Sequence, residues 1–395
     1  MSESLPSKTF CILPWVHLFS DSVGDMHPCC LYRKQRSEKT YNLHNPEQIS
    51  QYKNSNQIKE IKNQFLRGEE PQGCQACFEV ERAGSLSYRN SQNDLFNDSI
   101  KEIQTNTTHF KSFDLRLGNV CNLKCSMCGP HSSILILNDL LKDNPELKDD
   151  PEIKTYMNIN WYEDENIWEN LFQDYTHVRR IHLTGGEPLL MPQTLTLMKK
   201  LVDLGIAGDI ELSFNSNITV IRENTLELFR KFKAIHLFAS LDATGELNDY
   251  IRFPSVWEKV DQNLNDLLEK KDEYNIHTLQ IHLTLQNQNI FYLPEFLEFI
   301  HTHPNLELSD FDFFPLEGPD WYNIRFLPNE VKSAIKAKFQ QFETGRAILE
   351  SVLKILFDGE PDIKIFENFK WQISHQDSLR KKEFLKIVPE YKEFF

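Results

Sequence analysis

The sequence predicts an α/β protein built on parallel strands, and two observations support this fold class. First, short runs with strand character recur between residues 111 and 318, at 112–119, 179–185, 209–216, 234–241, 278–286 and 309–315. Second, stretches with helical periodicity separate most of these runs, for example Leu195 to Leu204 and Val256 to Lys271. Strands that alternate with helices form parallel sheets covered by those helices. The length of 395 residues permits two or three domains.

The chain is expected to begin with a small hairpin. Trp15 to Leu18 reads as a short strand, and Ser20 to Gly24 reads as a turn into a second strand. A polar helical stretch follows around Ile58 to Leu66.

Five of the eight cysteines lie before residue 80, so the cysteines of this part of the chain need a separate explanation. Cys11 and Cys29 lie near the two ends of the hairpin, Cys30 is adjacent to Cys29, and Cys74 and Cys77 form a CxxC pair. Two separated cysteines and a CxxC pair supply four ligands. That is enough for a closed [4Fe–4S] cluster or for a structural zinc ion. The sequence does not decide between Cys29 and Cys30 as the second ligand.

A second cysteine group follows the strand predicted at 112–119. Ser112 to Asn119 alternates polar and apolar residues and then runs into a loop that contains Cys121, Cys125 and Cys128. Three thiols are one fewer than the four that fill a [4Fe–4S] cluster, so one iron would stay open for a ligand. A zinc site is the competing interpretation, although zinc usually shows two CxxC pairs or added histidines. Three buried structural cysteines are the remaining alternative.

Each predicted strand has one polar and one apolar face, because side chains alternate along a strand. We expect the apolar faces to meet the helices and the polar faces to line the lumen. The polar faces carry Asp114 and Arg116; His182 and Thr184; Glu211, Ser213, Asn215 and Asn217; His236, Phe238, Ser240 and Asp242; and His282, Thr284 and Gln286.

After the last strand, Asn329 to Leu356 is predicted as one long amphipathic helix with Asn329 as its N-cap. Residues 366–395 are predicted to form a helix that packs through its aromatic stripe.

The cysteine loop resembles the cluster-binding loop of the radical S-adenosylmethionine (radical SAM) superfamily, and Met127 matches the apolar residue that often precedes the third cysteine there. The stretch IHLTGGEP supports this resemblance, since Gly185, Gly186, Glu187 and Pro188 are similar to the motif that holds the amino group of SAM. The resemblance implies a SAM-binding [4Fe–4S] cluster and a partial (β/α)6 TIM-type barrel. In such barrels the chemistry lies at the C-terminal strand ends, where both motifs fall.

A third stretch, Ser240 to Thr244 followed by Tyr250-Ile251-Arg252, resembles the SLD…R segment of SPASM/twitch radical SAM enzymes. The resemblance implies that Ser240 and Arg252 meet the carboxylate or ribose of SAM, and that Asp242 and Asn217 contribute to the same pocket. Arginine suits a carboxylate because its fork can bind two oxygens.

The N-terminal C-x12-G-x4-C stretch and CxxC pair resemble the front half of the SPASM/twitch auxiliary-cluster signature, although here they precede the barrel. The resemblance implies a second [4Fe–4S] cluster held by Cys11, Cys29, Cys74 and Cys77. The expected organisation is an auxiliary-cluster module at 1–110, a radical SAM partial barrel at 111–318, and a C-terminal loop and helical extension at 319–395.

The function implied by the resemblance is reductive cleavage of SAM to a 5′-deoxyadenosyl radical that abstracts hydrogen from a substrate. A peptide or protein side chain, oxidatively modified with the auxiliary cluster as electron acceptor, is the leading hypothesis. The alternatives are a dehydrogenase or isomerase of a small carbohydrate, aminocyclitol or nucleotide-like molecule and, in another class, a non-catalytic metal-binding protein. The sequence assigns no catalytic acid, base or radical quencher.

Charge and composition narrow the expected partners. The net charge of −15 argues against duplex nucleic acid as a partner. Neither a long apolar run nor a secretion signal is recognisable, so we expect a cytoplasmic protein without a membrane span. The resemblance implies a reductant such as flavodoxin or ferredoxin.

Overall fold

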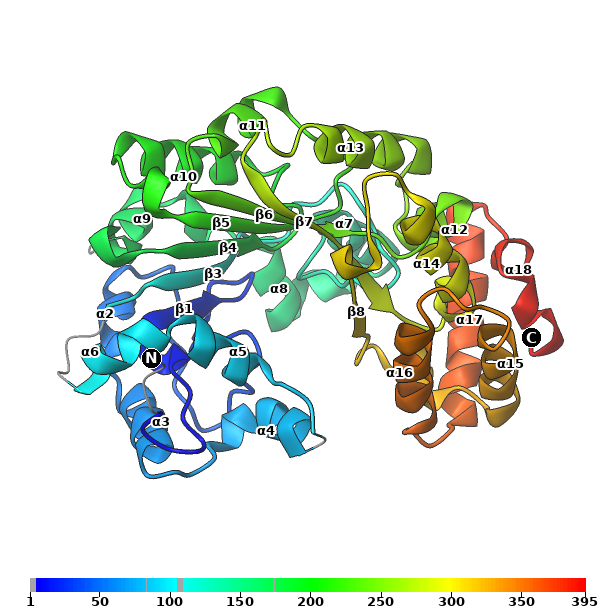
Figure 1. The fold of residues 1–395 in the computed structure, drawn as a ribbon, viewed down its shortest axis with the longest axis horizontal. Helices are drawn as coiled ribbons and strands as arrows, with labels where there is room; N and C mark the ends of the chain where they lie inside the picture. Colours follow the sequence, from blue (N-terminus) through cyan, green and yellow to red (C-terminus); the bar gives the residue numbers. More distant parts are fainter. Residues whose placement is uncertain (1–4, 83, 105–108, 173–174) are drawn as a thin grey trace. The chain divides into compact units, whose positions relative to one another are not determined.

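The computed structural model describes residues 5–82, 84–104, 109–172 and 175–395 and has an α/β fold (Figure 1). Among these residues, eight strands form one open, mostly parallel sheet in the order β2-β1-β3-β4-β5-β6-β7-β8. The strands are β1 (His17–Ser20), β2 (Met26–His27), β3 (Ser112–Arg116), β4 (Arg180–Thr184), β5 (Glu211–Ser216), β6 (Ala234–Ser240), β7 (Ile276–Leu285) and β8 (Phe311–Pro315). The predicted fold class is confirmed, and β3 to β8 are the six predicted strands.

The N-terminal hairpin is also confirmed, but its first strand is β1, and Trp15 and Val16, which were predicted as strand residues, belong to helix α1 (Leu13–Val16). The hairpin also has a role that its sequence does not predict. β1 pairs antiparallel with β2, with Phe19 opposite His27. On its other edge β1 pairs parallel with β3, with His17 opposite Ser112. The hairpin therefore extends the barrel sheet by two strands, and residues far from the barrel in the sequence belong to its wall.

Helices occupy most of the connections between strands (Figure 1). Before β3 lie α1 (Leu13–Val16), α2 (Glu47–Lys53), α3 (Asn56–Leu66), α4 (Gln75–Arg82), α5 (Tyr88–Leu95) and α6 (Ile100–Gln104). Between β3 and β8 lie α7 (Ile134–Asp143), α8 (Pro151–Met157), α9 (Glu165–Leu171), α10 (Pro192–Asp203), α11 (Glu223–Phe229), α12 (Gly245–Ile251), α13 (Trp257–Glu269) and α14 (Leu293–Thr302). After β8 lie α15 (Asn329–Phe339), α16 (Arg346–Phe357), α17 (Ile363–Arg380) and α18 (Phe384–Ile387).

The prediction of one long helix at 329–356 is wrong, because the chain breaks into α15 and α16. Gly345 stands at the break with φ +67°, a left-handed conformation that a right-handed helix cannot contain. Pro328, not Asn329, takes the N-cap position of α15. The C-terminal helix predicted at 366–395 is confirmed only in its first part, because α17 ends at Arg380, where Lys381 has φ +53°, and α18 and a short 3-10 helix follow. Phe366, Phe369 and Ile373 are the buried apolar residues of α17.

The predicted alternation of strand faces is confirmed. The apolar residues Ile181 and Leu183 of β4 and Leu212 and Phe214 of β5 are fully buried. The polar residues between them share the opposite face. In the register of the sheet, one row across that face reads Phe19, Asp114, His182 and Ser213. One wall of the sheet therefore presents polar side chains, as a site for a polar ligand requires.

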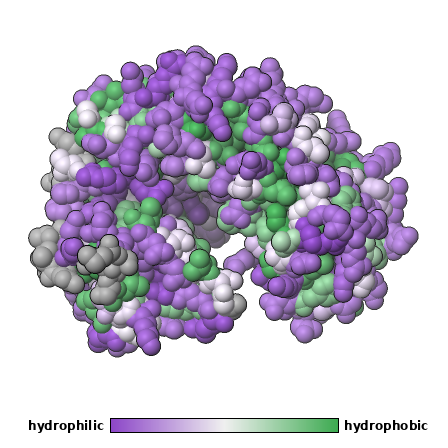
Figure 2. All heavy atoms as spheres, in the orientation of Figure 1, coloured by the Kyte–Doolittle hydropathy of each residue, from purple (hydrophilic) through white to green (hydrophobic). Residues whose placement is uncertain are grey.

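The chain divides into two compact units. The first comprises residues 1–120, 130–214 and 227–235, and the second comprises residues 121–129, 215–226 and 236–395. Within the described ranges, no helix has both the length and the apolar character that crossing a bilayer requires. Hydrophilic residues cover most of the face seen in Figure 2.

Candidate functional site

The loop that carries Cys121, Cys125 and Cys128 is fixed by backbone hydrogen bonds from the segment that follows β6. The Lys124 N–H donates to the Phe253 carbonyl at 2.6 Å, and the Ser126 N–H donates to the Ile251 carbonyl at 2.8 Å. The Cys128 N–H closes the loop on the Cys125 carbonyl at 3.1 Å. These bonds leave the loop little freedom around its middle cysteine.

The three thiols differ in exposure: Cys125 is buried, Cys121 is half-buried and Cys128 is exposed. A hydrogen bond between the thiols of Cys128 and Cys125 lowers the pKa of Cys125 and raises the pKa of Cys128. Across the described ranges of the chain, no three Cys, His, Asp or Glu side chains form a ready-made metal site. The donor set itself, three thiols on one loop, suits an iron–sulfur cluster that keeps one iron open.

The Gly185 to Pro188 turn follows β4 and packs on the backbone directly before Cys121. Its Glu187 N–H donates to the Val120 carbonyl at 2.8 Å. A Cβ on Gly186 would lie 2.1 Å from the Val120 oxygen, so only glycine allows this approach. The Glu187 side chain is 2% exposed, and its Oε1 accepts a hydrogen bond from the Leu189 N–H at 3.0 Å. The turn therefore contacts Val120, the residue directly before Cys121, and Pro188 is buried.

Asn217, which follows β5, is turned toward the cysteine loop. Its Nδ2 lies 3.9 Å from the Cys121 sulfur and donates to Asn122 Oδ1 at 3.1 Å. Asn122 in turn donates to the Thr219 hydroxyl at 2.8 Å. The sequence analysis did not single out Asn122 or Thr219. Asn122 could have been recognised as a site residue because it lies within the cysteine motif. Nothing in the sequence around Thr219 marks it as one.

Asp242 and Arg252 form a buried ion pair near the loop, with 2.8 Å between Asp242 Oδ2 and Arg252 Nε. Their exposed fractions are 1% and 8%. Burial raises the pKa of Asp242, and the guanidinium opposes this rise. Arg252 also lowers the pKa of Cys125, so its charge reaches the cysteine loop. Ser240, at the end of β6, and Met127 are half-buried.

The N-terminal cysteines come from three segments of the first unit. Cys11 precedes α1, Cys29 and Cys30 follow β2, and Cys74 and Cys77 lie at the junction of a short 3-10 helix with α4. Burial raises the pKa of all five thiols, and those of Cys11 and Cys30 reach about 12. Without a metal these thiols are therefore protonated at neutral pH.

Cys29 and Cys30 have different surroundings. After burial, the main influences on the pKa of Cys29 are the thiols of Cys30, Cys11 and Cys74. For Cys30 the corresponding influence is the Asp114 carboxyl on the polar face of β3. The pKa of Cys30 is also raised by the Cys77 thiol, so both adjacent cysteines are influenced by the other N-terminal thiols, while only Cys30 is also influenced by groups of β3.

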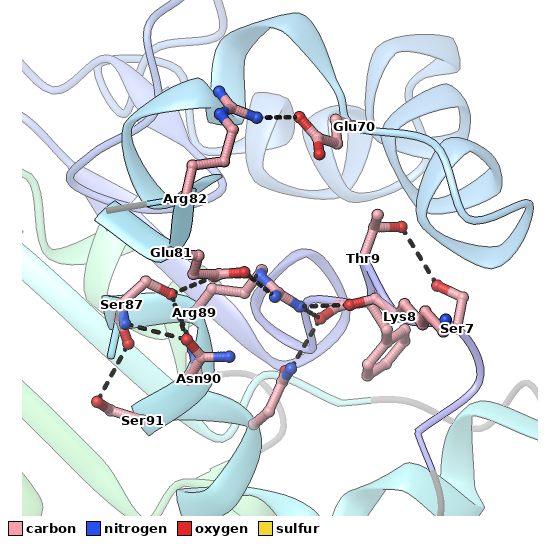
Figure 3. A network of polar contacts seen from close by, with 12 residues as sticks. Ser7, Lys8, Thr9, Glu70, Glu81, Arg82, Ser87, Arg89, Asn90 and Ser91 are labelled. Carbon is pink, nitrogen blue, oxygen red and sulfur yellow. Dashed lines mark hydrogen bonds and ion pairs between the residues drawn. The ribbon is translucent and has the colours of Figure 1, made fainter. Parts of the chain in front are cut away.

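A buried polar network holds the segment that contains Cys11 (Figure 3). Arg89, from α5, is paired with Glu81 of α4, donating through Nε at 2.9 Å, and also donates to the Phe10 carbonyl at 2.6 Å. Asn93 donates to the same carbonyl at 2.7 Å. Because α4 also carries Cys77, this network ties the segments of two cysteines together. The residues of this network lie in polar stretches of the sequence, from which no functional role was predicted.

Asp114 is the most unusual carboxyl group of the polar sheet face. It is 7% exposed, and no described residue donates a hydrogen bond to its Oδ1. Burial raises the pKa of Asp114 to about 7, while Arg116 opposes the rise. A carboxyl group with this pKa can release or accept a proton near neutral pH.

We expect the Asp114→Asn variant of the metal-free protein to be more stable than the wild type above pH 7. Below about pH 4 the carboxyl is protonated in both the folded and unfolded states, so it carries no penalty there. Between pH 4 and 7 the unfolded state has already released this proton and the folded state has not. Folding of the wild type therefore loses about 1.4 kcal/mol per pH unit. Urea unfolding between pH 5 and 8 measures the difference, and a gap that does not grow with pH would contradict the assignment.

Residues 115–300 match the family model described as the Radical SAM superfamily. A comparison with curated proteins finds no match.

Solved structures of two proteins illustrate the similarity. The chain is 17% identical to anSMEcpe with bound AdoMet and Cp18Cys peptide, with a TM-score of 0.35, covering 58% of this chain and 59% of that one. It is 16% identical to Streptococcus suis SuiB bound to S-adenosylmethionine, with a TM-score of 0.36, covering 80% and 64%. The chain thus spans less than two thirds of either protein.

Proposed function

We propose that this chain, whose residues 115–300 match the Radical SAM superfamily model, is an oxidoreductase that cleaves SAM reductively and uses the resulting radical on a substrate. One observation carries the proposal. The turn at 185–188 is bonded to the backbone that leads directly into Cys121, through the Glu187 N–H and the close approach of Gly186 to Val120. Gly186 and Glu187 belong to the proposed SAM-binding turn, and Cys121 is the first proposed cluster ligand.

Cys121, Cys125 and Cys128 would hold the cluster. The SAM pocket would comprise Gly185, Gly186, Glu187, Pro188, Met127, Asn217, Ser240, Asp242 and Arg252. When bound, these groups would supply one-electron cleavage of SAM to methionine and a 5′-deoxyadenosyl radical. Arg252 would bind a carboxylate of SAM through its fork, with Asp242 holding the guanidinium in place. Asn217 would steady Cys121 through Asn122.

Cys11, Cys29, Cys74 and Cys77 would hold a second [4Fe–4S] cluster, which would serve as an electron acceptor. Cys29 is proposed as the second ligand because the thiols of Cys11 and Cys74 both raise its pKa, whereas of the other proposed ligands only Cys77 is among the main influences on the pKa of Cys30. In this proposal the chain is a SPASM/twitch-like enzyme with its auxiliary module at 1–110, before the barrel at 111–318 and the extension at 319–395.

Replacing Cys11, Cys29, Cys74 and Cys77 by serine is expected to lower the iron content from about eight to about four per chain. SAM cleavage should persist, because the proposed SAM-binding loop keeps its own three thiols. Iron and sulfide analysis after anaerobic reconstitution measures the first effect and chromatography of 5′-deoxyadenosine the second. The matched control is Cys30→Ser, which should keep about eight irons; a loss of about four from that control would assign Cys30 as the ligand instead.

The proposed substrate is a peptide or protein side chain that undergoes oxidation. Asp114 would accept the proton that such a side chain releases, since its free oxygen and raised pKa suit a general base near neutral pH. An acidic one-electron carrier such as flavodoxin or ferredoxin would supply the reducing electron. The eight thiols need a reducing compartment, so the proposed location is the cytoplasm.

Anaerobic reconstitution followed by metal analysis and a SAM cleavage assay tests the proposal. About eight irons per chain, with 5′-deoxyadenosine formed on reduction, is the expected result. About four irons with one zinc ion would keep the radical SAM activity and reduce the N-terminal cysteines to a scaffold. A protein that takes up iron but forms no 5′-deoxyadenosine would contradict the proposed activity.

A further inference from the structure

The C-terminal helix α17 contacts the cysteine loop through Arg380. The guanidinium donates to the Ser126 hydroxyl at 2.9 Å, to the Lys124 carbonyl at 3.2 Å and to the Tyr250 carbonyl. Lys124 and Ser126 are the two neighbours of Cys125. One side chain from the far end of the chain therefore binds the residues on both sides of the buried cysteine, through the backbone of Lys124 and the hydroxyl of Ser126.

Gln376, one turn earlier on α17, makes a second contact with the same loop. Its Oε1 accepts a hydrogen bond from the Ser126 hydroxyl at 3.2 Å and another from Gln288 Nε2 at 3.1 Å. Its Nε2 donates to the Tyr322 hydroxyl at 2.6 Å. Gln376 is buried, so these partners fix its orientation. The Ser126 hydroxyl thus accepts from Arg380 and donates to Gln376.

The position of Arg380 is itself well defined. The guanidinium lies over the ring of Phe253, 5.7 Å from its centroid, and over that of Tyr250 at 5.1 Å. The carbonyls of Phe253 and Ile251 are the ones that accept hydrogen bonds from the cysteine loop. Arg380 therefore joins the loop to the segment that already supports its backbone.

We propose that α17 is a latch on the cysteine loop, with Arg380 and Gln376 as positioning residues for Cys125 and Cys128. The contacts are hydrogen bonds with defined geometry rather than apolar packing alone. A [4Fe–4S] cluster bound by three thiolates carries net negative charge, and a nearby guanidinium favours it. This inference rests on the proposed function, because the latch serves a loop that binds a cluster.

The test compares Arg380→Met, Arg380→Lys and Gln376→Leu with the wild-type full-length protein. A matched control is Leu379→Ala, since Leu379 is the neighbour of Arg380 and is 59% exposed. Two readouts follow anaerobic reconstitution: the rate at which a chelator removes iron, and the change that SAM produces in the EPR signal of the reduced protein. Only a cluster with an open iron gives the second signal, so the N-terminal cysteines do not interfere.

We expect Arg380→Met and Gln376→Leu to lose the SAM-responsive cluster about 10–100-fold faster than the wild type. Mutations of residues that support metal ligands typically have effects of this size. Arg380→Lys should fall between Arg380→Met and the wild type, because it keeps the charge and loses the fork. Leu379→Ala should match the wild type. If Arg380→Met fails to fold, Ser126→Ala removes the shared hydroxyl and should show the same direction of change.

Equal iron loss and equal SAM response in Arg380→Met, Gln376→Leu and the wild type would overturn the latch while leaving the proposed function intact. A wild-type protein without a SAM-responsive EPR signal would overturn the proposed function, and the latch with it.

Discussion

Simultaneous replacement of Cys121, Cys125 and Cys128 by alanine should abolish reductive cleavage of SAM and remove about four irons per chain. Thiolates are the only side chains of this loop that bind iron tightly, so no neighbouring residue can substitute. Methionine and 5′-deoxyadenosine formed after reduction with dithionite measure cleavage. Iron analysis of the same sample shows whether the N-terminal cysteines still bind their share.

The single variant Cys128→Ala separates chemistry from folding. Cys125 is buried and its loss leaves a cavity, whereas Cys128 is exposed and its loss costs little packing. Metal-free Cys128→Ala should therefore unfold at the temperature of the metal-free wild type, and the reconstituted variant should lose SAM cleavage. Cleavage at the wild-type rate in the triple variant would show that the iron responsible is held elsewhere in the chain, and the proposed function would then be wrong.

Replacement of Gly186 by alanine should destabilise the protein by about 1–3 kcal/mol and strongly weaken SAM binding. The added Cβ would lie 2.1 Å from the Val120 carbonyl oxygen and 2.4 Å from its carbon. These are backbone atoms without a flexible end, so the segment that leads into Cys121 must move. Urea unfolding of the metal-free protein measures the stability, and the SAM-dependent EPR change of the reconstituted protein measures binding.

Gly208→Ala is the matched control, since no described atom lies within 4 Å of a Cβ built at that position. Its free energy of unfolding should stay within about 0.5 kcal/mol of the wild type, and its SAM response should be unchanged. If Gly186→Ala behaves like Gly208→Ala in both measurements, the close approach of the two motifs has no functional meaning.

The sequence predicted the local elements well and the long-range partners poorly. All six barrel strands were predicted because their apolar and polar residues alternate, a property that each segment carries alone. The C-terminal stretch 329–356 was predicted as one helix because its apolar periodicity continues past Gly345. In the structure residues 340–345 are not helical, and Gly345, in a left-handed conformation, caps α16; its added Cβ would lie 2.6 Å from Leu297 in α14. A pattern of apolar residues along one helix cannot predict a contact with a different helix.

For the candidate site, too, the sequence predicted the local motifs and did not predict their long-range partners. The Cys121, Cys125, Cys128 loop and the Gly185 to Pro188 turn were visible in the sequence, because thiols at fixed spacing and glycines at a strand end have few other uses. The partners that hold them were not visible. Arg380 is an ordinary basic residue in a polar helix, and only the fold brings it to Ser126, 254 positions away.

The sequence by itself determined the fold class, the six strands between residues 111 and 318, and the two motifs that resemble those of the radical SAM superfamily, since these depend on residue type and spacing within short segments. Only the tertiary structure decided that the N-terminal hairpin joins the barrel sheet, that different neighbouring groups shift the pKa values of Cys29 and Cys30, and that α17 reaches the cysteine loop. Each of these depends on which surfaces pack together. Neighbouring residues such as Cys29 and Cys30 acquire different surroundings only when the backbone turns them toward different parts of the fold.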